Sequence, residues 1–215
     1  GGIEVKKAIG TRFIGAGFEL GGKDPAYVRA DCNFKHAVEN LVDGSYYNSG
    51  QSCCGIERIY VDESIFDNFI ESFKEKTEKY NLNNPLEDST NLGPVVKLSA
   101  ANTIREQISK AISNGAKNII DKNKFKIDKS DNCYVSPSAL VNVDHSMEFM
   151  MEETFGPTVG IMKVKNEEEA KTLMNDSPYG LTASIWTSDK EFAYNFGNKI
   201  QTGTFFMNRC DYLDP

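Results

Sequence analysis

Histidine and cysteine are scarce in this sequence, which limits the kinds of site that it can build. The 215 residues include two histidines and five cysteines, and these cysteines are Cys32, Cys53, Cys54, Cys133 and Cys210. No zinc-ligand spacing is present, and a disulfide framework is not expected in a chain of this length with so few cysteines. We therefore predict no metal, reduced thiols, and a reducing compartment, the cytoplasm.

Membrane-spanning runs and an excess of basic charge are also missing. No apolar run approaches the roughly 18 residues that suggest a membrane span, so we predict no membrane partner. The net charge of −7 argues against nucleic acid, because phosphate binding needs a basic face. No signal peptide is visible. Because the chain begins with Gly1 instead of methionine and ends at Pro215 without a closing element, we expect both ends to be cut and any targeting signal to lie outside them.

The residues that are present alternate between helical and strand patterns. Apolar spacing predicts helices that begin at Asp31 or Asn33 and at Asp62 or Ser64, and further helices over residues 98–112, 167–174 and 190–196. Short apolar runs predict strands at residues 59–61, 159–164, 183–186 and 204–207, with loops at 81–94 and 122–132. Strands that alternate with amphipathic helices predict an α/β fold, with a mostly parallel sheet and helices on both faces.

The first nine residues form a segment of their own. Gly1 and Gly2 precede a helix-compatible stretch that ends at Ile9. Free N–H groups at such a helix start, together with the positive end of the helix dipole, suit a phosphate group. Because glycines precede many helices, this pattern alone is weak support for a phosphate site.

Cys53 is the candidate nucleophile. It follows the turn-forming residues 48–50, and polar Gln51 and Ser52 precede it directly. A buried structural thiol is the alternative, since cysteine behaves as a small apolar residue. The glycine-containing turn, the polar neighbours and the adjacent Cys54 are unlike a core strand, and they favour a reactive thiol.

Glu19 is the candidate proton acceptor. It lies between Phe18 and Leu20 in an apolar, strand-like stretch that ends at the diglycine of residues 21–22. Open α/β sheets hold their sites at the carboxyl ends of strands, so we expect Glu19 at such an end. Partial burial there would raise its pKa and make it a usable base. A strand-end carboxylate that faces water is the alternative.

The acidic turn at residues 152–157 is a third candidate element. Glu152 and Glu153 precede Phe155 and a Gly-Pro pair. The sequence is compatible with a solvated acidic loop. It is also compatible with a carboxylate that accepts hydrogen bonds from a sugar diol, with an aromatic ring packed beside a flat ligand ring.

These segments, in this order, resemble the aldehyde dehydrogenase family. The resemblance is carried by residues 1–5 (GGIEV), 19–23 (ELGGK), 48–53 (NSGQSC), 152–157 (EETFGP) and 179–181 (YGL). It extends over essentially the whole chain. It implies that residues 1–18 are the last helix and lead-in strand of a cofactor-binding domain, and that residues 19–215 are a catalytic domain cut at its C-terminus.

The resemblance also implies roles for individual residues. The catalytic roles fall on Cys53 as the nucleophile and Glu19 as the general base. The cofactor-binding roles fall on Gly1, Gly2, Leu20, Glu153 and Phe155, and the substrate pocket takes in Tyr47, Ser52 and Cys54. The implied reaction is oxidation of an aldehyde to a carboxylic acid with NAD or NADP, through a hemithioacetal and a thioester on the cysteine. The family also implies a homo-oligomer for the full-length protein.

Two other functions are compatible with the same residues. Cys53 and Glu19 alone would support a cysteine esterase or acyl transferase that uses no nucleotide. A non-catalytic scaffold of the same fold is the third possibility. It has no physical need for both a thiol and a carboxylate at these two positions.

Overall fold

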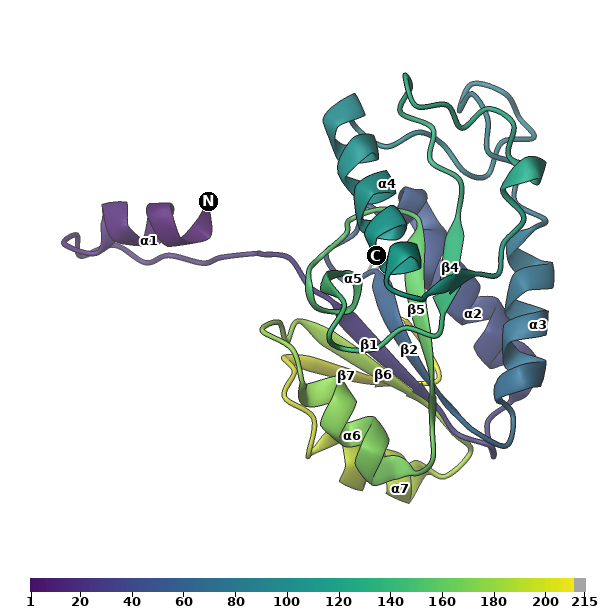
Figure 1. Cartoon of the computed structure of the whole chain (residues 1–215). Coiled ribbons are helices and arrows are strands. Elements are labelled where there is room, and N and C mark those ends of the chain that lie inside the picture. The colour runs from purple at the N-terminus through teal and green to yellow at the C-terminus, as the bar shows by residue number, and fades with distance from the viewer. Residues whose placement is uncertain (211–215) are drawn as a thin grey trace.

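The computed structural model of the chain describes residues 1–210 and contains a seven-stranded sheet in the order β3-β4-β5-β2-β1-β6-β7 (Figure 1). The strands are β1 (Asp24–Val28), β2 (Ile56–Asp62), β3 (Lys117–Asn118), β4 (Ser138–Val141), β5 (Thr158–Val164), β6 (Thr182–Trp186) and β7 (Thr204–Met207). Every neighbouring pair is parallel except the short β3, which pairs antiparallel with β4. The mostly parallel α/β sheet expected from the sequence is therefore confirmed.

Helices connect the strands and cover both faces of the sheet. They are α1 (Gly2–Ile9), α2 (Phe34–Tyr46), α3 (Phe66–Thr77), α4 (Leu98–Ser113), α5 (Glu148–Met151), α6 (Glu167–Asn175) and α7 (Lys190–Gly197), with short 3-10 turns η1 (Tyr47–Gly50) and η2 (Lys122–Lys124). Asn33 caps α2 through its side chain, which confirms Asn33 as the start among the two predicted for this helix, Asp31 and Asn33. Helix α3 begins only at Phe66, because the Asp62 carboxylate accepts hydrogen bonds from Ser64 and forms a turn before the helix.

The core is divided between the two faces of the sheet. Helices α2 and α3 pack on one face against alternate residues of the central strands, including Ile59 and Ile161. Helices α6 and α7 pack on the other face, where Tyr27 and Ile185 are buried. Helices α4 and α5 form a third apolar cluster beside β4. Figure 1 shows the resulting three layers, with the central strands β5, β2 and β1 covered on both sides.

The N-terminal segment stands apart from the sheet in Figure 1. The predicted helix is present as α1, but none of its residues is buried. Residues 13–23 form neither helix nor strand, so the expected lead-in strand before residue 19 and the strand carrying Glu19 are not found. The strand begins after the diglycine, at Asp24, instead of ending before it. The last five residues of the expected catalytic domain, 211–215, lie outside the described residues.

Within residues 1–210, no helix is long and apolar enough to cross a membrane. In the same part of the chain, no group of three or more His, Cys, Asp or Glu side chains is arranged to hold a metal ion.

Candidate active site

The candidate residues gather at the amino ends of the parallel strands. Gly21 and Gly22 lead into β1, Cys53 leads into β2, Glu153 and Phe155 lead into β5, and Tyr179 leads into β6. Because neighbouring parallel strands begin at the same edge of a sheet, these four loops meet there. The sequence predicted a site at the carboxyl end of a strand, and the structure corrects this. The usual rule for open α/β sheets does not hold for these loops.

Gly22 brings the first three loops together. Its N–H donates a hydrogen bond of 2.9 Å to Glu153 Oε1. A Cβ built on Gly22 would lie 2.5 Å from the carbonyl oxygen of Cys53, which is closer than real contacts allow. Gly22 is therefore in direct contact with the backbone of Cys53 and bonded to the carboxylate of Glu153. Glycine is required at residue 22 because any side chain there would push these two loops apart.

A left-handed turn precedes Cys53 and sets its position. Asn48, Ser49 and Gly50 have φ values of 49°, 58° and 70° in succession. Non-glycine residues in this region carry a cost of roughly 1–2 kcal/mol each, so the turn must be held by its surroundings. A Cβ built on Gly50 would lie 2.0 Å from the carbonyl oxygen of Gly156. The Cys53 loop therefore also packs directly against the loop that carries Glu153.

Hydrogen bonds hold this strained turn in place. Ser49 Oγ donates to the carbonyl of Gly93 at 2.6 Å. Gln51 Oε1 accepts from the N–H of Val96 at 2.8 Å, and Gln51 Nε2 donates to the carbonyl of Asn48 at 2.9 Å. The 81–97 segment thus supports the backbone immediately before Cys53.

Cys53 itself is half-buried, as are its neighbours Ser52 and Cys54. Ser52 Oγ lies 3.4 Å from Cys54 Sγ, so these two expected pocket residues are in contact with each other. Tyr47, the third expected pocket residue, is exposed. The sequence expectation that Cys53 follows a tight turn and is not part of a core strand is confirmed.

Two other cysteines are in a different environment. Burial, together with the nearby Asp31 carboxylate, raises the pKa of Cys32 to about 11. Burial also raises the pKa of Cys210. Both thiols are therefore protonated at neutral pH and poorly suited to nucleophilic chemistry.

Glu153 and Phe155 are two residues apart on the same loop and differ in exposure. The Glu153 side chain is half-buried, and this burial raises its pKa, while the hydrogen bond from Gly22 acts in the opposite direction. The N–H of Glu153 also donates to the hydroxyl of Tyr179 at 3.4 Å. Phe155 has a φ of 52° and keeps its ring exposed. A carboxylate held by Gly22 and an exposed aromatic ring on the same loop are compatible with the expected contacts to a sugar and a flat ring.

Sequence reasoning missed two residues beneath this loop. Lys23 and Glu57 form a buried ion pair, with Lys23 Nζ 2.5 Å from Glu57 Oε2. The Glu57 carboxylate also accepts hydrogen bonds from the N–H groups of Thr154 and Phe155. Burial lowers the pKa of Lys23, and the Glu57 carboxylate opposes this shift. Lysine in the diglycine motif and a glutamate inside an apolar strand were the only sequence signals for this pair.

The remaining predicted residues lie in the N-terminal segment. Glu19 is exposed, and it is not buried as the sequence analysis expected for a base with a raised pKa. It is three positions before Gly22 in the sequence, so its Cα lies within about 11 Å of that glycine. Leu20 packs over Gly2, because a Cβ built on Gly2 would lie 2.9 Å from a methyl carbon of Leu20. Gly1 is exposed at the start of α1, where no side chain caps the helix.

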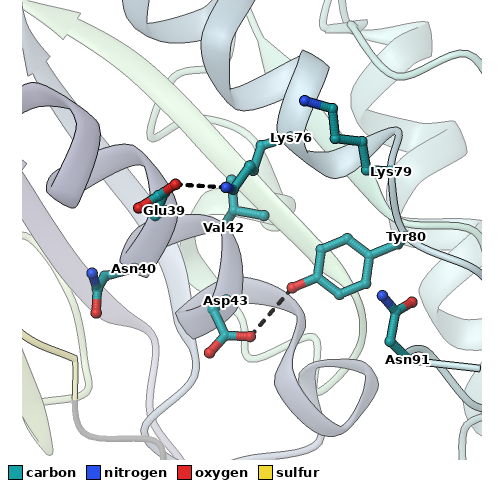
Figure 2. Close-up of a pocket in the computed structure, with 8 residues that line it drawn as sticks. All are labelled: Glu39, Asn40, Val42, Asp43, Lys76, Lys79, Tyr80 and Asn91. Carbon is teal, nitrogen blue, oxygen red and sulfur yellow. Dashed lines mark hydrogen bonds and ion pairs between the residues drawn. The ribbon is translucent and has the colours of Figure 1, made fainter.

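A pocket of about 460 Å³ lies elsewhere, between α2, α3 and the loop after α3 (Figure 2). Its lining is Glu39, Asn40, Val42, Asp43, Lys76, Lys79, Tyr80 and Asn91. Lys76 is paired with Glu39 at 2.7 Å, and the Tyr80 hydroxyl donates to Asp43 at 3.3 Å. None of the predicted site residues lines this pocket, and its charges are already partnered, so we assign it no chemistry.

Comparison with known proteins gives one consistent result. Residues 1–214 match the model of the aldehyde dehydrogenase family. The 3-sulfolactaldehyde dehydrogenase of Priestia megaterium is 33% identical over 95% of this chain, which corresponds to 41% of that protein. The "Aldehyde dehydrogenase [NAD(P)+] 1" of Saccharomyces cerevisiae is 29% identical over 100% of this chain and 43% of its own length.

Solved structures agree with the sequence matches. Betaine aldehyde dehydrogenase from Staphylococcus aureus, solved with NAD+, superposes with a TM-score of 0.89 at 31% identity, over 97% of this chain and 42% of that one. NADP-dependent glyceraldehyde-3-phosphate dehydrogenase from Bacillus halodurans, solved with NADP, gives a TM-score of 0.84 at 36% identity, over 92% and 40%. The chain thus spans less than half the length of these relatives, and it belongs to the aldehyde dehydrogenase family.

Proposed function

We propose that this chain carries the catalytic part of an NAD(P)-dependent aldehyde dehydrogenase, with Cys53 as its nucleophile. The observation that carries the proposal is the contact of three loops at the amino ends of the strands. Gly22 lies against the backbone carbonyl of Cys53 and donates a hydrogen bond to Glu153. These contacts support a site that would combine the Cys53 thiol with a carboxylate for the cofactor ribose. Family membership supports the same reaction class.

Cys53 supplies the covalent step. Its thiolate attacks the carbonyl carbon of an aldehyde and forms a hemithioacetal, in which the former carbonyl oxygen carries the negative charge. Backbone N–H groups of the turn around Cys53 are the donors available to this oxyanion, and the N–H of Cys53 is our candidate. The rigid left-handed turn before Cys53 favours catalysis, because a pre-positioned nucleophile loses little freedom on the way to the transition state.

Glu19 is proposed as the base that activates water for hydrolysis of the thioester on Cys53. Its position near Gly22, on the chain segment that enters the site, supports this role. Glu19 is exposed, and residues 13–20 around it form no regular structure. The attacking water would lie between Glu19 and the thioester on Cys53, so direct contact between Glu19 and Cys53 is unnecessary.

Residues of two segments fit the cofactor. Glu153 would accept hydrogen bonds from the ribose of the nicotinamide half, and the exposed ring of Phe155 would pack beside it. The uncapped start of α1, at Gly1 and Gly2, would meet the pyrophosphate, with Leu20 beside it. When bound, NAD or NADP supplies the acceptor for the hydride that leaves the aldehyde carbon, which converts the adduct on Cys53 into a thioester.

Small aldehydes are the substrate class that we propose. Relatives are named for 3-sulfolactaldehyde, lactaldehyde and D-glyceraldehyde, and one solved structure is named for betaine aldehyde. The pocket would be formed by Tyr47, Ser52 and Cys54 beside the nucleophile. For the full-length protein we also propose a homo-oligomer, as the family implies.

The test uses the full-length gene product and rapid mixing with aldehyde and cofactor. Cys53→Ser should abolish reduction of NAD and NADP, whereas the matched variant Cys133→Ser should not. Glu19→Gln should leave the first turnover of hydride transfer intact and slow the steady-state rate, because thioester hydrolysis is impaired. An equal loss of the first turnover and of the steady state in Glu19→Gln would remove Glu19 from the role of base.

A further inference from the structure

A buried ion pair lies directly beneath the loop that carries Glu153. Lys23 is 1% exposed and Glu57 is 4% exposed, and their charged atoms are 2.5 Å apart. Lys23 follows the diglycine and directly precedes β1, and Glu57 is the second residue of β2. The pair therefore connects the two strands whose preceding loops carry Gly22 and Cys53.

Glu57 makes further bonds, and these go to the Glu153 loop. Its Oε1 accepts from the N–H of Phe155 at 2.9 Å, and its Oε2 accepts from the N–H of Thr154 at 2.9 Å. Two consecutive N–H groups that point at one anion form a backbone nest, which is a conformation that a negative charge stabilises. Lys23 closes the arrangement by donating to Thr154 Oγ1 at 3.2 Å.

This nest explains the unusual backbone of Phe155. Its φ of 52° is in the left-handed region, where a non-glycine residue is stable only if its surroundings hold it. The bond from Phe155 N–H to the Glu57 carboxylate is such a restraint. As a result, Glu153 points toward the N–H of Gly22, while the ring of Phe155 stays exposed on the same loop.

We infer that Glu57 is a positioning residue for cofactor binding, with Lys23 as its counter-ion. Through the nest at Thr154 and Phe155, it orients the Glu153 carboxylate and the Phe155 ring toward the nicotinamide half of NAD or NADP. This inference rests on the proposed function and adds two residues that do not touch the reacting atoms.

The same geometry predicts a separation of effects. The hydrogen bonds of the Glu57 side chain go to Thr154 and Phe155 of the Glu153 loop and to Lys23. The hydrogen bonds of Ser49 and Gln51 in the Cys53 turn go to the 81–97 segment, although Gly50 of this turn also packs against Gly156, next to Phe155. Loss of the Glu57 charge should therefore weaken cofactor binding and leave the reactivity of the Cys53 thiol unchanged. A residue that only stabilised the fold would lower both together.

The experiment compares Glu57→Gln with the exposed control Glu63→Gln in the full-length gene product. Steady-state kinetics give the KM for NAD and for NADP, and iodoacetamide labelling without cofactor gives the reactivity of Cys53. We expect Glu57→Gln to raise the cofactor KM at least about tenfold, since loss of charge-assisted hydrogen bonds has effects of this size, and to change the labelling rate less than twofold. The control should match the wild type in both.

A second variant covers the case in which Glu57→Gln does not fold because Lys23 is left unpaired. The double variant Lys23→Met/Glu57→Gln removes both charges, and the same rise in cofactor KM is expected. An unchanged cofactor KM, or an equal loss of cofactor binding and Cys53 labelling, would overturn the positioning role. If the wild-type protein reduced neither cofactor with any aldehyde, the proposed function would fail instead, which is a different result.

Discussion

Alanine substitution of four glycines tests how closely the site loops are packed. Gly50 combines a φ of 70° with a Cβ position 2.0 Å from the Gly156 carbonyl oxygen. Gly22 has only the close approach, at 2.5 Å from the Cys53 carbonyl oxygen. Gly115 has only the positive φ, 105°, and open space around it. Gly15 has neither feature. The four positions therefore separate backbone strain from steric overlap.

The expected losses of stability follow from these two costs. A left-handed residue other than glycine costs roughly 1–2 kcal/mol, and an overpacked side chain costs about 1–3 kcal/mol. Gly115→Ala should therefore lose about 1–2 kcal/mol, and Gly22→Ala about 1–3 kcal/mol. Gly50→Ala carries both costs and should lose about 2–5 kcal/mol. Gly15→Ala should be neutral or slightly stabilising.

Urea unfolding of the 215-residue chain, with a common m-value for the four variants, measures these differences. Iodoacetamide labelling of Cys53 in the same samples reports on the site. Gly22→Ala and Gly50→Ala should alter the labelling rate, whereas Gly115→Ala should not. The reasoning is refuted if Gly22→Ala is as stable as Gly15→Ala, because the loops of Gly22 and Cys53 would then not be in contact.

Three further predictions concern pH, thiol selectivity and the isolated chain. Burial raises the pKa of Asp24 to about 7, against hydrogen bonds from Thr182 that lower it. Between about pH 4 and 7, Asp24 is therefore protonated to a greater extent in the folded state than in the unfolded state. As a result, Asp24 makes the free energy of unfolding fall as pH rises, by at most about 1.4 kcal/mol per pH unit. Asp24→Asn should remove that slope in urea titrations at several pH values, and an unchanged slope would contradict it. In limited alkylation at pH 8, only about one in a thousand Cys32 thiols is ionised, because the Cys32 pKa is about 11. Cys53 should therefore be labelled before Cys32 and Cys210. Peptide mapping checks this, and preferential labelling of Cys32 or Cys210 counts against Cys53. The 215-residue chain alone should show no dehydrogenase turnover, because it spans less than half the length of its relatives; micromolar binding of NAD or NADP in calorimetry would show that the cofactor contacts are wrongly assigned.

The sequence predicted the alternation of helices and strands, because both patterns depend on local spacing of apolar residues. Helices α4, α6 and α7 and strands β5, β6 and β7 are present close to their predicted bounds. Strand β1 was not predicted, because it opens with Asp24 and Pro25 after a buried lysine, and these residues are poor strand formers by composition. Only pairing with β2 and β6 makes this segment a strand.

Parts of the site could not be predicted because they depend on contacts between distant residues. The turn before Cys53 could be predicted from the sequence, because its glycine and polar neighbours form a local pattern. The ion pair of Lys23 with Glu57 joins strands that are distant in sequence, and no local pattern indicates it. Glu19 was expected in a strand because apolar residues flank it, but that segment packs on no sheet and remains exposed. The strand end that carries the site was assigned wrongly, because it depends on how loops pack and not on their composition.

Trapping of the acyl group on the protein is the most direct test of the proposed chemistry. The full-length Glu19→Gln variant, mixed with an aldehyde and NAD or NADP and quenched in acid, should carry one acyl group per active site. Mass spectrometry of its peptides should locate that group on Cys53 as a thioester. Reduction of the cofactor with the acyl group on a different residue, or with no acyl group on the protein at all, would contradict the assignment of Cys53 as the nucleophile.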